Sequence, residues 1–266
     1  MTHRYALEAA SCTDPGLVRS FNEDSIALDA EAGLLVLADG MGGYKAGDVA
    51  SQLATGLILE QIKERRPGMG AAAAVSDAVR RANTAIFEAA QADARYQGMG
   101  TTLVLLLVQD GRAIVGHVGD SRLYRLRRGQ LELITQDHSL LREQVEQGLI
   151  TAEDARVSHN RNLVTRALGV EPEVELELTE QEVLPEDIYL LCSDGLNDMV
   201  DDADIALVLA SLKSNLPLAA QQLVMIANDN GGHDNVSVML ARVTGQPAVP
   251  RGWFARVLGW FGSGRE

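Results

Sequence analysis

Two apolar runs in this chain end in the same way. "LLVLADG" ends at Asp39-Gly40, and "IYLLCSDG" ends at Asp194-Gly195. Short apolar runs of this kind are typical of buried strands. A single Asp-Gly pair after a strand is most often a turn, because aspartate caps its own backbone and glycine accepts a positive φ. Its recurrence is the strongest constraint on the fold, since it places carboxylates at the ends of buried strands.

Further acids occupy similar positions. Asp120 follows "AIVGHVG", Asp234 precedes "VSVML", and Glu23 and Asp24 precede the weakly apolar "IALDA". If these strands lie side by side, the carboxylates converge and repel one another, so a cation must accompany them. Carboxylates without nearby His or Cys pairs favour Mg²⁺ or Mn²⁺. Two such ions about 4 Å apart share a bridging water and lower its pKa, which is the chemistry of phosphoester hydrolysis.

The remaining pattern predicts an α+β domain. Short apolar or alternating segments predict strands at 33–38, 101–108, 113–118, 122–126, 131–135, 187–192 and 236–243. Turn residues at 109–111 and 127–130 have hairpin spacing, which indicates antiparallel neighbours. Apolar residues at helical spacing predict two helix pairs, 46–65 with 70–93 and 202–211 with 216–229. Runs of strands with packed helix pairs are typical of layered α+β domains.

Composition excludes several classes of protein. The net charge of −14 over 266 residues disfavours nucleic-acid binding, which normally needs a basic surface. Cys12 and Cys192 are too few and too far apart for a disulfide framework, and both are expected to be small apolar residues. The sequence shows neither a signal peptide nor an apolar run long enough to span a bilayer. We therefore expect a cytoplasmic protein.

Two segments differ from this core. Residues 137–170 are polar with short, weak helical patterns, and we expect them to leave the core. Residues 244–250 are expected to be a linker to the tail 251–266, which holds both tryptophans of the chain. Apolar tail residues at helical spacing beside Arg251 and Arg256 predict a short helix. That helix either folds back on the domain or frays, or it docks to a partner or membrane surface.

The chain resembles a known family through motifs that occur in a fixed order. They are "GLVRSFNEDS", "ADGMGG", "GTTLVLLLV", "GHVGDSRLY", "TQDHSL", "RALG", "LCSDGL" and "HDNVSVML". Over roughly residues 5–243 it is similar to the metal-dependent Ser/Thr protein phosphatases of the type 2C (PPM) family, bacterial branch. The resemblance implies a four-layer α-β-β-α sandwich, with two mostly antiparallel sheets flanked by helix pairs. It also implies a PPM-type catalytic domain over 1–243, with 137–170 as a flap, and a linker and tail over 244–266.

The resemblance also implies a metal site and a phosphate site. The implied ligands of two Mn²⁺ or Mg²⁺ ions, and of a third, weaker ion at Asp120 and Asp194, are Asp24, Asp39, Gly40, Asp120, Asp194 and Asp234. Asp39 bridges the two core ions, Gly40 contributes its carbonyl, and Asp24 acts mainly through water. Glu23 is a less certain ligand. Arg19 is implied to bind phosphate, and the alternative for it is a surface ion pair with Asp24.

One position departs from the family pattern. Many relatives have a histidine just after "DGMGG" that is proposed as the general acid, and here the residue is Tyr44. A tyrosine with a pKa near 10 is a poorer acid at neutral pH. Either Tyr44 donates the proton, or a metal-bound water does, or the acid is elsewhere. For the other histidines, His117, His138, His159 and His233, we favour structural roles.

The implied activity is hydrolysis of phosphoserine and phosphothreonine in proteins by a bridging metal-bound water, with Arg19 and Asp39 as catalytic residues. Phosphorylated proteins and a cognate Ser/Thr kinase are the expected partners, and a monomer is expected. One alternative is a pseudophosphatase that binds phosphoproteins without hydrolysing them. Another is a phosphatase dedicated to an anti-anti-sigma-type regulator, which is disfavoured because no sensor region precedes the catalytic unit.

Overall fold

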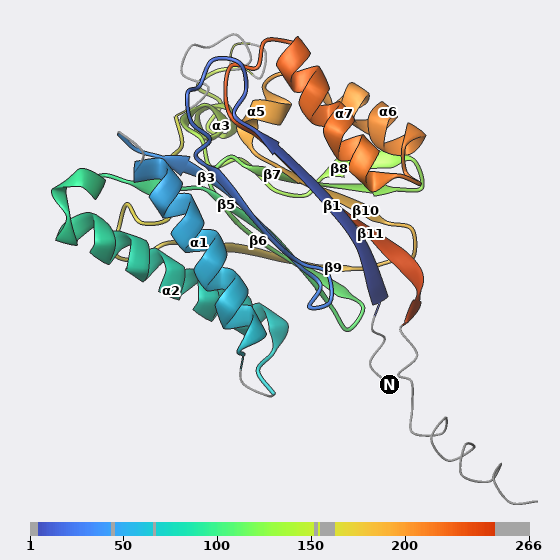
Figure 1. Cartoon of the computed structure of the whole chain (residues 1–266), viewed down its shortest axis with the longest axis horizontal. Coiled ribbons are helices and arrows are strands. Elements are labelled where there is room, and N and C mark those ends of the chain that lie inside the picture. The colour runs from blue at the N-terminus through green and yellow to red at the C-terminus, as the bar shows by residue number, and fades with distance from the viewer. Residues whose placement is uncertain (1–4, 44–45, 66–67, 152–153, 155–162, 248–266) are drawn as a thin grey trace, which may run out of the picture.

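Two antiparallel sheets packed face to face form the centre of the protein (Figure 1). The structure is a computed structural model, and it describes residues 5–43, 46–65, 68–151, 154 and 163–247. The first sheet has the order β1 (Tyr5–Asp14), β11 (Val236–Pro247), β10 (Ile188–Cys192), β7 (Arg122–Arg127) and β8 (Gln130–Leu133). The second has the order β2 (Asp24–Asp29), β3 (Leu34–Met41), β5 (Leu103–Gln109), β6 (Arg112–Val118) and β9 (Glu177–Glu182), with the short β4 (Gly100–Thr101) beside β3.

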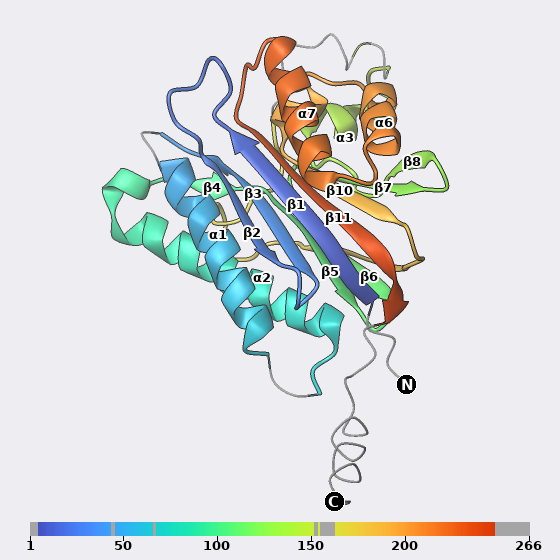
Figure 2. The same ribbon diagram turned by 45° about the vertical axis from the view of Figure 1, so that its right-hand side comes forward.

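A helix pair covers the outer face of each sheet, as Figures 1 and 2 show. Helices α1 (Ala46–Lys63) and α2 (Ala71–Ala92) pack on the second sheet. Helices α6 (Asp202–Ser211) and α7 (Leu216–Asp229) pack on the first. The shorter helices are η1 (Ala94–Tyr96), α3 (Leu140–Glu146) and α5 (Asp194–Asn197). The predicted four-layer α-β-β-α sandwich is confirmed.

The apolar runs of β3 and β5 follow from this layering. In β3, Leu34, Val36 and Ala38 face the helix pair, whereas Leu35 and Leu37 face the other sheet. Side chains alternate between the faces of a strand, and here both faces are covered, so every position from Leu34 to Ala38 is apolar. Burying one such Leu or Val side chain contributes about 1.5–3 kcal/mol. The strands that carry the acids are therefore among the best-anchored parts of the fold.

Local turn chemistry sets the two hairpins that the sequence predicts. Asp110 and Gly111, between β5 and β6, have φ values of 52° and 80°. Arg128 and Gly129, between β7 and β8, have φ values of 52° and 80°. Two consecutive residues with positive φ match the right-handed twist of the flanking antiparallel strands.

Three strands lie outside the predicted set, because their patterns are weak. β9 has no continuous apolar run, since its residues alternate between half-buried and exposed at the sheet edge. β1 is also an edge strand, and β2 has only a short apolar stretch. β11 continues to Pro247, beyond the boundary expected at residue 243, because it pairs with β1 as far as Tyr5. The tail 251–266 lies outside the described residues.

Cys12 is half-buried and Cys192 is buried. Both cysteines are free thiols, and burial raises the pKa of the Cys192 thiol to about 12. A thiol with so high a pKa is a poor nucleophile. In the part of the chain that the structure describes, no helix combines the length and apolar character needed to cross a bilayer.

Candidate metal and phosphate site

Asp24 and Asp39 lie opposite each other on neighbouring strands. Asp24 begins β2 and pairs in register with Asp39 near the end of β3. Directly opposed residues of an antiparallel pair have Cβ atoms about 5 Å apart. The Asp39 N–H donates to Thr102 Oγ1 at 3.0 Å, and the Asp39 carbonyl accepts the Thr102 N–H at 2.9 Å. These bonds fix the strand end where the first two carboxylates meet.

The other sheet supplies Asp194 and Asp234. Asp194 follows β10 at the start of α5, and Asp234 immediately precedes the Asn235 that leads into β11, the neighbour of β10. Ser193 Oγ donates to Asp24 Oδ2 at 2.8 Å. This bond joins residues 169 positions apart and ties the two sheets together at one end of the sandwich.

Asp120 reaches the same place from the turn between β6 and β7. Its neighbour Ser121 shares a hydrogen bond of 2.7 Å between its hydroxyl and that of Thr102. Because Thr102 also accepts the Asp39 N–H, the two turns that carry Asp39 and Asp120 are linked through paired hydroxyls.

The five carboxylates lie close enough together to repel one another. Burial, and then repulsion from Asp24 and Asp194, raises the pKa of Asp39 well above its usual range. Burial, and then repulsion from Asp120, does the same to the pKa of Asp194, and Asp234 adds to both. Burial is also the main cause that raises the pKa of Asp24 and of Asp120 to about 6. The convergence predicted from the sequence is therefore present in the fold.

The residues present fit a divalent metal centre. Among the described residues, the buried atoms without a hydrogen-bond partner include Asp24 Oδ1, Asp194 Oδ1 and Glu23 Oε1. A buried carboxylate oxygen is costly unless a cation or a donor accompanies it. The acids offer only oxygen ligands, which suit the hard ions Mg²⁺ and Mn²⁺. Glu23, the less certain candidate, directly precedes Asp24 and likewise has a buried oxygen without a partner.

Position 40 requires glycine because the backbone carbonyls of Gly47 and Glu23 lie very close to it. A Cβ atom at Gly40 would lie 2.1 Å from the Gly47 carbonyl oxygen and 2.7 Å from the Glu23 carbonyl oxygen. No side chain fits there without moving the backbone. Gly40 therefore lets the start of α1 pack directly against the end of β3, beside Asp39.

Arg19 is the cation that lies over the acids. Its Nη2 is 2.7 Å from Asp234 Oδ2, and its side chain remains 54% exposed. The hydrogen bond to Asp234 raises the pKa of Arg19, and the charges of Asp194 and Asp39 add to the effect. The alternative pairing with Asp24 is wrong, because the arginine pairs with Asp234 instead. Its exposed guanidinium leaves donors open to solvent, as a phosphate-binding arginine requires.

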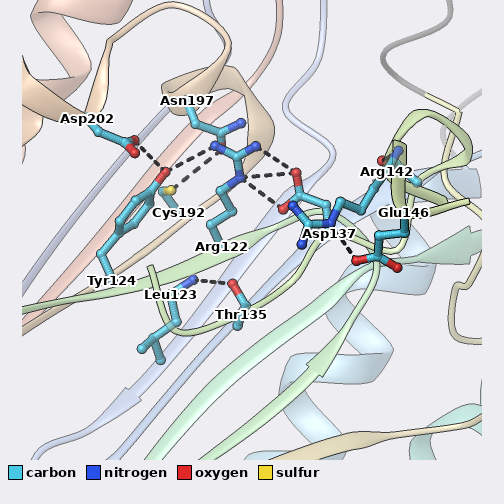
Figure 3. Close-up of polar contacts among 11 residues, drawn as sticks. Arg122, Leu123, Tyr124, Thr135, Asp137, Arg142, Glu146, Cys192, Asn197 and Asp202 are labelled. Carbon is cyan, nitrogen blue, oxygen red and sulfur yellow. Dashed lines mark hydrogen bonds and ion pairs between the residues drawn. The ribbon is translucent and has the colours of Figure 1, made fainter. Parts of the chain in front are cut away.

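A half-buried ion pair anchors the first residue of the 137–170 segment beside the site (Figure 3). Arg122 binds Asp137 through Nε at 2.9 Å and Nη2 at 2.6 Å, and its Nη1 donates to the Tyr124 hydroxyl at 3.1 Å. Tyr124 in turn donates to Asp202, at the start of α6, at 3.0 Å. This chain fixes the base of the segment to β7, two residues after Asp120.

His117 and His138 are buried together, at ring centroids 4.7 Å apart, and Glu177 lies beside them. The Gly119 N–H donates to His138 Nδ1 at 3.1 Å, so His138 carries its proton on Nε2 and donates it to Glu177 at 3.2 Å. A histidine that binds a metal needs one deprotonated ring nitrogen for the metal, while its other ring nitrogen donates a hydrogen bond. In His138 the deprotonated nitrogen already accepts the Gly119 N–H. The geometry therefore favours a structural role for His138.

The other candidates for a general acid differ in where they lie. His233 is exposed next to Asp234. Tyr44 and His159 lie outside the described residues.

The sequence did not single out the residues that support the acids. Thr102, Ser121, Ser193 and Asn235 bond to the acids or to their neighbouring backbone. Each lies inside or next to a motif that the sequence shows, but its partner is far away in the chain. For Ser121, Ser193 and Asn235, a polar residue directly next to a strand-end aspartate was the signal that could have identified them, whereas Thr102 has no such neighbour.

Comparisons with known proteins agree with this geometry. The family model described as Protein phosphatase 2C matches residues 18–225. The serine/threonine protein phosphatase PstP of Mycobacterium tuberculosis is 43% identical over 237 residues, which cover 89% of this chain and 45% of PstP. The chain thus spans about half the length of this curated relative.

Two solved structures are similar in fold as well as sequence. The catalytic domain of PstP in complex with two manganese ions has a TM-score of 0.82 and 41% identity, covering 90% of this chain and 99% of that one. Stp1 of Staphylococcus aureus has a TM-score of 0.85 and 36% identity, covering 92% of this chain and 98% of the other. Since the family model covers most of the chain and the fold and site agree with it, this protein belongs to the protein phosphatase 2C family.

Proposed function

We propose that this protein is a metal-dependent phosphatase that hydrolyses phosphoserine and phosphothreonine in proteins. The observation that supports this most is the convergence of Asp24, Asp39, Asp120, Asp194 and Asp234 at one end of the sandwich. Since the described acids include every carboxylate that the proposed metal site needs, an active enzyme is favoured over a pseudophosphatase. The relatives named serine/threonine phosphatases support the same substrate class.

In this proposal Asp39, Asp194 and Asp234 are the main carboxylate ligands of two Mn²⁺ or Mg²⁺ ions. Asp24 and the Gly40 carbonyl complete the core site, and Asp120 belongs to a third, weaker ion. PstP, which is similar over the whole catalytic domain, was solved with two manganese ions. Bound ions of this kind lower the pKa of water enough to supply a nucleophile near neutral pH.

The chain's own residues position the substrate phosphate. Arg19 lies 2.7 Å from Asp234 and keeps an exposed guanidinium. We assign it to the phosphate oxygens, because its planar fork donates two parallel hydrogen bonds to such a dianion. Asp234 holds the guanidinium in place and offsets its charge, so the arginine is oriented before the substrate arrives.

The partners follow from the proposed reaction. The substrates are phosphorylated proteins, and a Ser/Thr kinase is the enzyme whose products this protein hydrolyses. A catalytic domain that extends through β11, past the boundary expected at residue 243, is part of the proposal. So are a flap over 137–170, a monomeric state, a cytoplasmic location and a role for the tail, which lies outside the described residues.

The test is hydrolysis of p-nitrophenyl phosphate and of phosphothreonine, phosphoserine and phosphotyrosine peptides, with Mn²⁺ or Mg²⁺ added. We expect turnover of the phosphoserine and phosphothreonine peptides, slow or no turnover of phosphotyrosine, and loss of activity in EDTA. The Asp39→Asn variant should lose turnover while its circular dichroism spectrum stays unchanged.

Asp204→Asn is the matched control, since it removes the same charge from an exposed position in the first turn of α6. It should keep wild-type activity. Turnover that persists in EDTA, or full activity in the Asp39→Asn variant, would contradict the proposed function.

A further inference from the structure

Three exposed apolar side chains flank Arg19 on the loop between β1 and β2. Leu17 is 70% exposed, Val18 is 62% exposed and Phe21 is 56% exposed. We call these three residues the apolar lip. Single exposed apolar residues are common on protein surfaces, whereas contiguous exposed apolar patches mark interaction sites.

The backbone of this loop is firmly held. The Leu17 N–H donates to the Gly232 carbonyl at 2.8 Å. The Asn235 side-chain amide donates to the carbonyls of Pro15 at 3.0 Å and Phe21 at 2.9 Å, one at each end of the loop. The lip is therefore displayed on an ordered backbone, and its exposure is not a consequence of a loose loop.

The anchoring residues belong to the site itself. Asn235 follows Asp234 directly, and its Oδ1 accepts the Glu23 N–H at 2.7 Å. The Asn235 side chain thus connects the backbone of the lip to the backbone of Glu23, which precedes Asp24. Because Arg19 lies between Val18 and Phe21 and pairs with Asp234, a phosphate at the arginine would place adjoining substrate residues against the lip.

The charge of this segment favours an anionic ligand. The segment from Pro15 to Asn22 has one charged side chain, the cationic Arg19, in a chain whose net charge is −14. An anionic phosphopeptide can approach this segment without facing an acidic side chain from it. Apolar groups on either side of the arginine complement a peptide whose phosphorylated residue has apolar neighbours.

We propose that the apolar lip binds an apolar side chain next to the phosphoserine or phosphothreonine of the protein substrate. This inference rests on the proposed function and specifies its substrate class. The lip selects phosphorylation sites with Leu, Val, Ile or Phe close to the phosphorylated residue, and it acts on peptide recognition while the acids act on the phosphate.

The test compares two phosphothreonine peptides that differ only in whether Leu or Ala flanks the phosphothreonine. We expect wild type to prefer the Leu peptide by about tenfold in kcat/KM, which is the size of effect that one buried apolar side chain produces. The double variant Leu17→Ser, Phe21→Ser should lose most of this preference, mainly through a higher KM. The loop bonds use backbone carbonyls and N–H groups, so these substitutions keep them.

Leu207→Ser is the matched control, because Leu207 is 64% exposed on α6, away from the site. It should keep the preference for the Leu peptide. An equal preference in the double variant and in wild type would overturn the inference. Equal kcat/KM values of wild type for the two peptides would also overturn it. So would sedimentation that shows a dimeric wild type and a monomeric double variant, because the lip would then be an interface between copies.

The result that would overturn the proposed function differs from those that would overturn the apolar lip. If p-nitrophenyl phosphate is not hydrolysed in Mn²⁺, the phosphatase assignment is wrong. Binding of the same two peptides, labelled with a fluorophore, then tests the lip alone by anisotropy. A tenfold tighter binding of the Leu peptide that the double variant loses would support the lip in that case, and equal binding would overturn it.

Discussion

Arg19 and Asp234 are 215 positions apart in the sequence and form an ion pair of 2.7 Å. This pair joins the loop that carries the apolar lip to the carboxylate that precedes β11. Its two members have opposite tasks in the proposed reaction, since the arginine binds the phosphate and the aspartate binds a metal ion. The pair therefore couples the phosphate and metal positions directly.

Replacing Arg19 with Ala should weaken phosphate recognition. Hydrogen bonds to charged groups contribute about 1.5–3 kcal/mol, so kcat/KM on a phosphothreonine peptide should fall by roughly 10- to 100-fold, mainly through KM. Arg95→Ala is the control, because Arg95 pairs with Asp93 at an exposed site, with an Arg side chain 78% exposed. Steady-state kinetics that are the same for the Arg19→Ala variant and wild type would remove the arginine from the phosphate site.

Replacing Gly40 with Ala should disrupt the site without a change of charge. The added Cβ would lie 2.1 Å from the Gly47 carbonyl oxygen, so the end of β3 must move away from α1. Isothermal titration should show Mn²⁺ binding at least tenfold weaker.

Gly56→Ala provides the comparison, since nothing lies within 4 Å of a Cβ at Gly56 in the middle of α1. It should keep Mn²⁺ binding and stabilise the protein by about 0.5–1 kcal/mol, because alanine favours a helix over glycine. Equal Mn²⁺ affinity for both variants would show that the close approach at Gly40 is unimportant for the site.

Replacing Asp194 with Asn should have opposite effects on the metal-free and metal-loaded proteins. Without metal, burial and repulsion from Asp120 raise the pKa of Asp194, so its charge destabilises the fold at neutral pH. In EDTA the variant should therefore have a higher Tm than wild type. Added Mn²⁺ at a hundred times its Kd should stabilise wild type by about 2.7 kcal/mol and the variant much less. If the variant is less stable than wild type in EDTA, the charge of Asp194 does not destabilise the metal-free fold.

His117 should make the protein sensitive to mild acid. Burial, and then the neighbouring His138, lowers the pKa of His117 from its ordinary value of 6.5 to about 4. The unfolded state therefore binds the proton first as the pH falls, so stability is full above pH 6.5 and is lost as the pH falls toward 4. At pH 5 the loss from this residue is about 2 kcal/mol.

Urea denaturation of wild type and the His117→Asn variant in EDTA, at pH 7 and pH 5, measures this contribution. The difference between the two pH values should be smaller in the variant by about 2 kcal/mol. His233→Asn, which changes an exposed histidine, should show the wild-type difference. A variant that loses as much stability as wild type would show that His117 is not the group that titrates.

Local patterns in the sequence predicted the α+β class and the acids, whereas the four-layer sandwich was implied by the resemblance to a family. The apolar run that ends at Asp39 is visible in the sequence, and so are the glycine turns at Gly111 and Gly129. β9 was missed because an edge strand needs little apolar surface. The Arg19–Asp234 pair was missed because it depends on how the loop after β1 reaches β11, which no local pattern specifies.

The supporting hydroxyls were missed for the same physical reason. Thr102 bonds Asp39 from the next strand, and Ser193 bonds Asp24 across the two sheets. Residue type alone does not reveal such partners, since they depend on strand register and on the packing of one sheet against the other. The kinds of residue at the site are predictable from sequence, whereas their hydrogen-bond partners require the fold.

Crystals of the protein grown with Mn²⁺ give the most direct measurement, through an anomalous difference map collected near the manganese absorption edge. The account predicts two strong peaks that share a carboxylate oxygen of Asp39, one or both also in contact with Asp194 or Asp234. A map with no manganese at Asp39, or with manganese bound only elsewhere on the surface, would contradict it.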